Sequence, residues 1–427
     1  MIKKDGLKYF TYITLALLYL AAVCFAGPRE LASGLRSLIL CRDALITDYF
    51  ELVGYGAAFL NAALVMTLSM IMIEHAELPY TGLTIAAIFI NTGFGFWGKN
   101  FVNIIPIHFG TMLYAKAHHT SMSRYTYTAL FATCLSPFVT ELTYILPFDM
   151  WGNLGIAVLA GLFMGYVLPP LSQHTASMHM GYSLFNVGFS GGILAFVLFC
   201  VLKSFGISSE PVFIWKAERH MGLLVGVSVY LAAAFVLGWY MNEWKIKNLR
   251  KLLKHPGRAV ADFVLLDGPG VTLMNMSLTG AAALLYAMLV GGDFSGPVLG
   301  CLFTVFGFAA FGAHLRNYLP VLAGVFLATV ITHYSPSEAG MLIAAFFVVG
   351  IAPIAGQFGP IWGIIAGMLH ACIVMCTSMM YGGLNLYNNG FSCGWVAIIM
   401  VPVIESFMHG YEMRKMKRKA KKGAESP

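Results

Sequence analysis

Apolar segments alternate with short polar stretches along the whole chain. Most of these segments carry few charges and approach the ~20 residues that an α-helix needs to cross a bilayer. They lie near residues 8–26, 52–74, 82–98, 100–116, 125–146, 151–171 and 188–206, and then near 220–243, 268–290, 295–312, 317–332, 339–356, 359–379 and 391–408. The pattern predicts an all-α integral membrane protein built from two halves of about seven segments each.

The two halves share a sequence plan. Between residues 54 and 107, a shift of 214 gives eleven identical pairs in 54. The first members are Gly54, Gly56, Asn61, Leu64, Gly82, Phe89, Gly93, Phe94, Gly98, Asn103 and Pro106. Shared Gly, Asn and Pro indicate specified backbone geometry. We therefore expect an N-terminal transmembrane repeat (1–210), a C-terminal one (211–412) and a basic cytoplasmic tail (413–427).

An odd number of crossings in each half predicts that the second repeat is inverted. The loop 28–51 has three Lys or Arg residues, whereas its counterpart, 241–267, has six. The positive-inside rule therefore places both chain ends in the cytoplasm. Segments 82–98 and 100–116 could instead form a re-entrant hairpin, and the number of crossings would stay odd. Inverted repeats of this kind are typical of transporters with a solute site near the membrane midplane.

Composition supports a membrane location. Hydrophobic residues make up 59% of the chain and charged residues 11%, against about 25% charged in soluble domains. The first apolar segment follows three lysines, as in a signal peptide, but many more segments follow and we expect it to be retained. The eight cysteines form no CxxC pair and look like small apolar fillers. We predict a multi-pass protein of the cytoplasmic membrane.

Two similar phrases, FNVGFSGG at 185–192 and YNNGFSCG at 387–394, open the last segment of each half. Their glycines would loosen the helix and leave backbone groups free, which protein or a water-filled cavity must satisfy. We predict solute contacts here; the alternative is that Asn caps the helix and Gly allows close packing. The predicted substrate-binding residues are Asn186, Ser190, Asn388, Asn389 and Ser392, together with the repeated pairs Asn61 and Asn275, and Asn103 and Asn317.

Two cations near the repeated Gly-Asn-Pro stretch are further candidates. Lys99 belongs to the first copy and Arg316 to the second. Each could extend to a lipid headgroup. The alternative is that one or both face the cavity and attract an anion, which fits their asymmetry because a scaffold requirement should recur in both copies.

The stretches LSPFVTEL and IAPIAGQF place Glu141 and Gln357 at matching points, four residues after a proline. A carboxylate within an apolar segment is costly and usually functional. Glu141 is therefore the predicted ion-coupling residue, with Gln357 keeping its hydrogen-bonding shape. The alternative is that Glu141 lies at the membrane surface.

Other classes of chemistry find little support in the sequence. The histidines are scattered, HExxH is absent, and no GK[ST] loop occurs. We expect no cofactor, no metal and no enzyme activity. The basic residues cluster beside apolar segments, which indicates membrane lipid rather than nucleic acid as partner. The predicted function is a secondary transporter for a small polar or anionic solute, coupled to H⁺ or Na⁺. A passive urea- or ammonium-like channel and, with less support, a membrane-embedded enzyme or sensor are alternatives, and homo-oligomers are possible.

The phrases GFGFWGKN, LFNVGFSGG and LYNNGFSCG resemble those of an uncharacterised family of bacterial multi-pass membrane proteins, a domain of unknown function. That resemblance implies no substrate. GYGAAFLNAALV and LFNVGFSGGILA are also similar to glycine–asparagine phrases of urea channels, inverted-repeat permeases that form trimers. The additional segments and the charged residues Lys99, Glu141 and Arg316 depart from a channel for a neutral solute.

Overall fold

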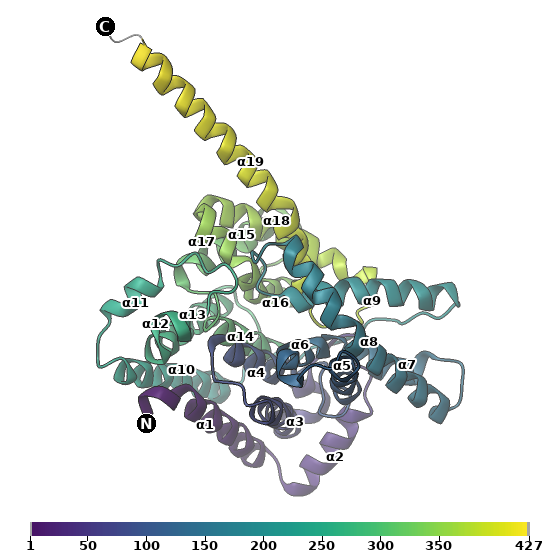
Figure 1. Cartoon of the computed structure of the whole chain (residues 1–427). Coiled ribbons are helices and arrows are strands. Elements are labelled where there is room, and N and C mark those ends of the chain that lie inside the picture. Colours follow the sequence, from purple (N-terminus) through teal and green to yellow (C-terminus); the bar gives the residue numbers. More distant parts are fainter. Residues whose placement is uncertain (1, 425–427) are drawn as a thin grey trace.

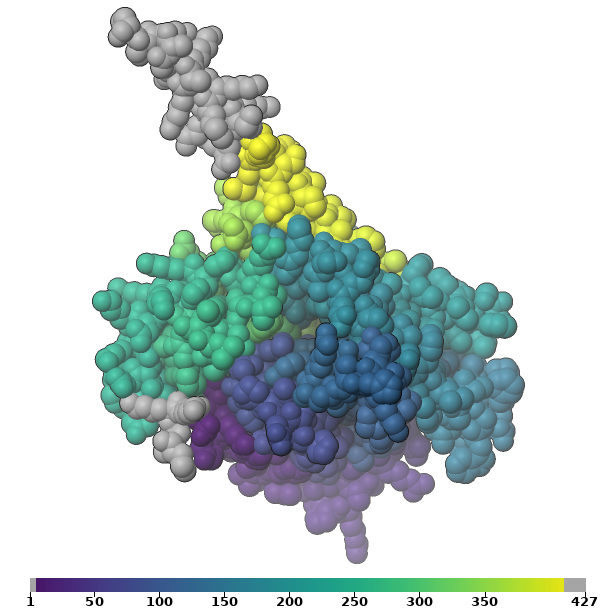
Figure 2. Space-filling model, in the orientation of Figure 1, coloured from purple at the N-terminus to yellow at the C-terminus, as the bar shows by residue number. Residues whose placement is uncertain are grey.

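The computed structural model describes the backbone of residues 2–424 and the side chains of residues 5–410. The side chains of the predicted basic tail, 413–427, lie outside the described ones. The protein is almost entirely helical, and the two halves of the chain pack against each other in one body (Figure 2).

Most helices of the first half coincide with predicted segments, but the helix Pro28–Ile39 lies in the stretch 28–51 that was predicted to be a loop (Figure 1). The helices of this half are α1 (Ile2–Phe25), α2 (Pro28–Ile39), α3 (Tyr49–His75), α4 (Gly82–Phe94), α5 (Ile105–Ala117), η1 (Met122–Arg124), α6 (Thr126–Ala132), η2 (Thr133–Leu135), α7 (Ser136–Ile145), α8 (Met150–Met178) and α9 (Asn186–Ser204). The short η2 joins α6 to α7, where Pro137 occupies the first turn of α7.

The second half repeats this order of elements. Its helices are α10 (Met221–Met241), α11 (Lys247–Leu252), α12 (Phe263–Asp267), α13 (Pro269–Leu289), α14 (Gly296–Phe308), α15 (Leu315–Ile331), α16 (Ala339–Phe347), η3 (Val348–Ile351), α17 (Ala352–Phe358), α18 (Pro360–Met380) and α19 (Asn388–Ala424). The break between α12 and α13 lies at Gly268, with φ +91°, and the equivalent Gly54 has φ +77° inside α3. Such values favour glycine, which lacks a Cβ.

Ten helices among the described residues are long and apolar enough to span a membrane, five in each half. The chain is therefore a multi-pass, all-α membrane protein, as predicted. The predicted segments 82–98 and 100–116 are shorter helices, α4 and α5, of 13 residues each. At 1.5 Å per residue each is about 20 Å long, less than the ~30 Å hydrocarbon core. This length fits the re-entrant hairpin better than two crossings.

Two strands link the halves. β1 (Leu45–Thr47) pairs in parallel with β2 (Val212–Ile214), with Leu45 opposite Val212. These three-residue strands tie the loop after α2 to the loop before α10. The apolar periodicity of the sequence did not predict them.

Two aspartates, one in each half, cap a helix of their own half and also bind the first turn of a helix in the other half. Asp48 caps α3 through the amide of Phe50, at 2.9 Å, and its Oδ1 also accepts from the amide of Gly296 at the start of α14, at 3.1 Å. Asp262 caps α12 in the same way, and its Oδ1 accepts from the amide of Gly82 at the start of α4, at 2.9 Å. Each aspartate thus satisfies amides that a helix start leaves free, in its own half and in the other.

Glycines allow the two halves to approach each other at two crossings. A Cβ on Gly93 of α4 would lie 2.3 Å from the carbonyl oxygen of Gly300 of α14. Where α9 meets α19, a Cβ on Gly188 would lie 3.2 Å from Cα of Gly390, its counterpart at a shift of 202. Small residues at such crossings let helix backbones pack closely within membranes.

Candidate functional site

A buried lysine lies where the turn after α4 meets the start of α19. Lys99 is fully buried, and its Nζ donates to Asn91 Oδ1 at 2.8 Å and to the Tyr387 hydroxyl at 2.9 Å. Thr133 Oγ1 lies 2.9 Å from the same Asn91 oxygen. Nζ also lies 4.7 Å from the centre of the Tyr387 ring and 5.3 Å from that of Phe94. None of the ion pairs among residues 5–410 includes Lys99.

The polar groups around Lys99 contain more donors than acceptors. An ammonium has three N–H donors, and only Asn91 and Tyr387 accept from it. The Tyr387 hydroxyl accepts from Lys99, and no acceptor for its own hydrogen lies among the described residues. One N–H and one O–H are therefore left to point at a group that brings acceptor oxygens. A buried ammonium without an anion costs several kcal/mol, so an anionic group fits this cluster best.

Two cavities have walls next to this cluster. Cavity A, of about 440 Å³, has Tyr387 in its wall, and cavity B, of about 190 Å³, has Trp97 in its wall. The ring of Phe94 lies between them, 4.8 Å from the Tyr387 ring and 4.7 Å from the Trp97 ring, centre to centre. A single buried aromatic ring thus stands between the wall residues of the two cavities.

The residues lining the two cavities are counterparts of each other. Residues in the wall of cavity A whose repeat counterparts lie in the wall of cavity B include the pairs Ala259 and Leu45, Val260 and Ile46, Phe311 and Trp97, Leu184 and Leu386, and Asn186 and Asn388. The repeat that duplicates the helices therefore also duplicates the cavities. Only cavity A, however, contains Tyr387, the residue that reaches Lys99.

Cavity A combines aromatic walls with a few polar groups. Phe131 and Phe308 belong to its wall, as does His179, which is 2% exposed. His179 Nε2 lies 2.9 Å from Asn186 Oδ1, and its Nδ1 has no hydrogen-bond partner among the described residues. An apolar pocket of this size with few polar groups is typical of sites for small organic molecules.

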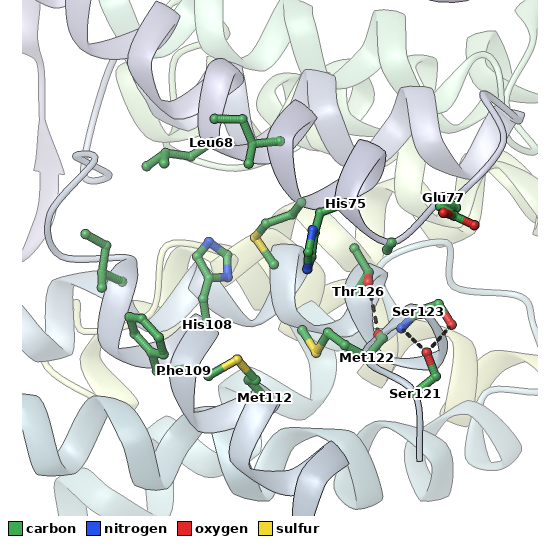
Figure 3. Close-up of a pocket in the computed structure, with 14 residues that line it drawn as sticks. Leu68, His75, Glu77, His108, Phe109, Met112, Ser121, Met122, Ser123 and Thr126 are labelled. Carbon is green, nitrogen blue, oxygen red and sulfur yellow. Dashed lines mark hydrogen bonds between the residues drawn. The ribbon is translucent and has the colours of Figure 1, made fainter.

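A third cavity, of about 670 Å³, lies within the first half (Figure 3). His75 of α3 and His108 of α5 project into it, and Ser121 and Ser123 lie at one end. Its wall includes Ile71 and Phe109, whose exposed fractions are 56% and 51%. The cavity therefore opens on the apolar outer surface, where lipid chains fit better than a polar solute. No cluster of His, Cys, Asp or Glu within the described part of the chain could hold a metal.

The predicted asparagines mostly hold backbone turns. Asn61 donates to the carbonyls of Gly95 and Lys99 at 2.7 and 2.8 Å, and Asn275 makes the equivalent bonds at the same distances. Asn103 and Asn317 donate to the carbonyls of Gly98 and Gly312 in the turns before α5 and α15. These two pairs thus shape the turn that carries Lys99 and its counterpart.

The two repeated phrases also bond to neighbouring helices. Asn186 and Asn388 accept from Thr175 and Thr377 respectively, and both line a cavity. The remaining predicted residues of these phrases bond as follows: Ser190 to Thr175, Asn389 to His370, and Ser392 to the His370 carbonyl. Asn186, Asn388 and Asn389 are therefore the members of this set that reach a cavity wall.

The structure separates the predicted charged residues. Arg316 is exposed, whereas Lys99 is fully buried, so the two cations do not share a site. Glu141 has a fully buried side chain and pairs with Arg42, with Nη2 to Oε2 at 2.6 Å. Ser209 donates to the same carboxylate at 3.2 Å. Gln357 is exposed and does not repeat this environment.

Several residues of the cluster escaped the sequence analysis, yet a signal for them was present. Polar residues near Lys99 or Asp43 have counterparts without a polar side chain in the other half, at sequence shifts of 202 to 216. These pairs are Asn91 and Val305, Thr133 and Val349, Tyr387 and Phe185, Tyr49 and Phe263, and Asp43 and Gly257. The asymmetry that pointed to Lys99, whose counterpart is Ala313, would have pointed to these residues as well.

Comparison with known proteins identifies the family of the chain. No curated protein and no solved structure matches the chain. One family model, described as a protein of unknown function (DUF1576), matches residues 27–204 and 241–406. The matched segments include α2 to α9, α11 to α18 and most of the apolar part of α19. They cover the Lys99 cluster, cavity A and the wall of cavity B except Phe213, and the chain therefore belongs to the DUF1576 family.

Proposed function

We propose that the protein is a secondary transporter of the cytoplasmic membrane for small organic anions, with its solute site at the inner end of cavity A. The observation that carries this proposal is a fully buried lysine with only neutral partners, next to the barrier between two repeat-related cavities. A carboxylate would accept hydrogen bonds from Lys99 and Tyr387. The apolar body of the solute would lie against the aromatic walls.

The symmetry of the contacts between the halves supports an alternating-access mechanism. Two halves are related by an approximate two-fold axis when each contact between them occurs twice, the second time between the counterparts of the first two residues. Asp48 with Gly296 and Asp262 with Gly82 form such a set, and Gly188 touches its own counterpart, Gly390. With five long spans in each half, this axis lies in the membrane plane, and cavities A and B open on opposite sides.

A carrier fits these cavities better than the predicted alternative, a passive channel. Phe94 is 1% exposed and packs on Trp97, Tyr387 and Phe347, so the space between the cavities is filled by rings. Opening cavity B to the Lys99 cluster therefore requires the halves to move. Movement about the close glycine contacts of α9 with α19 would alternately expose the cluster to each cavity.

Cysteine labelling tests the sidedness of the two cavities. Val260, which lines cavity A, and Phe213, which lines cavity B, are 81% and 59% exposed. In vesicles of known orientation, we expect a membrane-impermeant thiol reagent to label Val260→Cys from the cytoplasmic side and Phe213→Cys from the other side. The background would carry alanine at the accessible cysteines 24, 41, 200, 372 and 376. Labelling of both variants from one side would contradict the inverted arrangement.

Flux measurements in proteoliposomes test the function itself. The full chain should take up at least one of acetate, isobutyrate and benzoate with saturable kinetics, and the matching amide at least about tenfold more slowly, because the amide lacks the charge that Lys99 requires. Urea serves as the channel probe. The proposal fails if no carboxylate moves, or if carboxylate, amide and urea all move without saturation.

A further inference from the structure

A second buried charged group, Asp43, lies in the loop between α2 and α3. Its side chain is fully buried, and every hydrogen bond it receives comes from a neutral group. The Tyr49 hydroxyl donates to Oδ1 at 3.0 Å, whereas Thr140 Oγ1 and Asn103 Nδ2 donate to Oδ2 at 3.3 and 3.4 Å. The neighbouring cation, Arg42, instead pairs with Glu141.

The charge of Asp43 is not needed to build the turn beneath it. In the second half, Asn317, the counterpart of Asn103, lies 3.5 Å from the backbone carbonyl of Pro256, and Gly257 replaces Asp43. In the second half a neutral carbonyl thus takes the place of the carboxylate as the acceptor for the asparagine. Asp43 therefore adds a titratable group that the equivalent turn of the second half lacks.

Asp43 is connected to Lys99 by a short path. Asn103 Nδ2 bonds both to Asp43 and to the carbonyl of Gly98, at 3.3 Å, and Ser136 Oγ donates to that carbonyl at the same distance. Gly98 immediately precedes Lys99 and has φ +74°. A change in the hydrogen bonds of Asp43 therefore acts on the peptide that positions the lysine.

We propose that Asp43 is the proton-binding site whose occupancy is coupled to anion binding at Lys99; this inference rests on the proposed transport function. Protonation of Asp43 changes the hydrogen bond that it receives from Asn103 and so acts on the Gly98 carbonyl next to Lys99; through this path proton and anion favour each other's binding. The proton and the anion then cross the membrane together, and neither binds tightly without the other. Glu141, in contrast, keeps its cation and has a structural role in this arrangement.

The surroundings of Asp43 fit a proton better than a metal ion. Burial raises the pKa of Asp43 well above its usual range; the hydrogen bonds from Tyr49 and Thr140 oppose this rise, and the nearby Glu141 adds to it. Three donors occupy the carboxylate oxygens that a metal ion would need, whereas the hydroxyls of Tyr49 and Thr140 can also accept a hydrogen bond from the protonated acid. The other charged or titratable groups near Asp43 are Cys41 and Arg42 of the same loop and Tyr144 of α7; Lys99 lies in the turn after Gly98, and its Nζ points to Asn91 and Tyr387.

Infrared spectroscopy of the full chain in lipid tests this site directly. A protonated carboxylic acid has a carbonyl stretch separate from the amide bands. We expect this band near neutral pH, its loss on alkalinisation, and its absence in Asp43→Asn. The exposed-carboxylate control Glu405→Gln and the variant Glu141→Gln should both keep it. A band that survives in Asp43→Asn, or that is missing from the native protein at pH 6, would overturn the proposal.

A second variant keeps the test decisive if Asp43→Asn does not fold. Tyr49→Phe restores the residue found at Phe263 in the other half and removes a donor to the ionised carboxylate. Losing such a bond should raise the midpoint of the band by about one pH unit. An unchanged midpoint would contradict the assignment to Asp43.

Benzoate then tests the coupling. Saturating benzoate should raise the titration midpoint by about one pH unit, whereas benzamide should leave it in place. A midpoint that benzoate does not move overturns the coupling, even if the band itself titrates as expected. Failure of every carboxylate in the flux assay, with the band lost in Asp43→Asn, would instead remove the transport function and leave the proton site standing.

Discussion

Replacing Lys99 by methionine is expected to weaken benzoate binding by about a hundredfold or more, because removing one partner of a buried charged contact costs about 2–5 kcal/mol. Saturable uptake should fall in parallel. The free energy of unfolding should rise, since the variant no longer buries an ammonium that has only neutral partners. Equilibrium binding, flux and thermal unfolding of the same preparation would measure all three effects.

Two further variants sharpen this expectation. Tyr387→Phe, which copies its counterpart Phe185, removes one donor and should weaken benzoate binding about tenfold. Arg316→Gln removes an exposed cation and should leave binding as it is. If Lys99→Met binds benzoate as tightly as the native protein does, the anion site lies elsewhere.

Replacing Arg42 by glutamine is expected to lower the free energy of unfolding by about 3–5 kcal/mol. Glu141 has no exposed side-chain surface, and Arg42 contacts it through both Nε and Nη2, at 3.1 and 2.6 Å. Without the guanidinium, the carboxylate stays buried without a cation. Thermal or denaturant unfolding in detergent would measure the loss.

The matched comparison is an ion pair exposed to water. Lys245 and Glu243 lie 2.8 Å apart with exposed fractions of 62% and 55%. Lys245→Gln should therefore cost less than about 1 kcal/mol. The double change Arg42→Gln with Glu141→Gln should recover most of the stability lost in Arg42→Gln alone. Equal losses at the buried and exposed pairs would show that Glu141 does not depend on Arg42.

Local patterning was enough to predict much of the fold. The predicted segments coincide with helices to within a few residues at most ends, because apolar runs of bilayer length leave few other structures possible. The main exceptions are segment 391–408, whose helix α19 continues to Ala424, and segment 151–171, whose helix α8 continues to Met178 through two internal prolines. The suspicion of a hairpin at 82–116 also followed from local signals, namely short apolar runs around a glycine-rich turn.

The polar cluster could be predicted only in part. Lys99 was found because charge is rare in apolar segments, but its partner Tyr387 is 288 positions away and reaches it only through the contact between halves. Asp43 belongs to the predicted loop 28–51 and was not a candidate, since its partners Asn103 and Thr140 come from two distant segments. The coupling role first predicted for Glu141 stays a prediction, with a bound arginine weighing against it.

The reciprocal caps have a consequence for biosynthesis. The first backbone amides of α4 lack their acceptor until Asp262 is synthesised, 180 residues after Gly82. The first half therefore has to remain in the membrane with an unfinished hairpin until much of the second half has been inserted. A chain truncated after α9 should be a substrate for membrane proteases, and co-expression of the two halves as separate polypeptides should protect both.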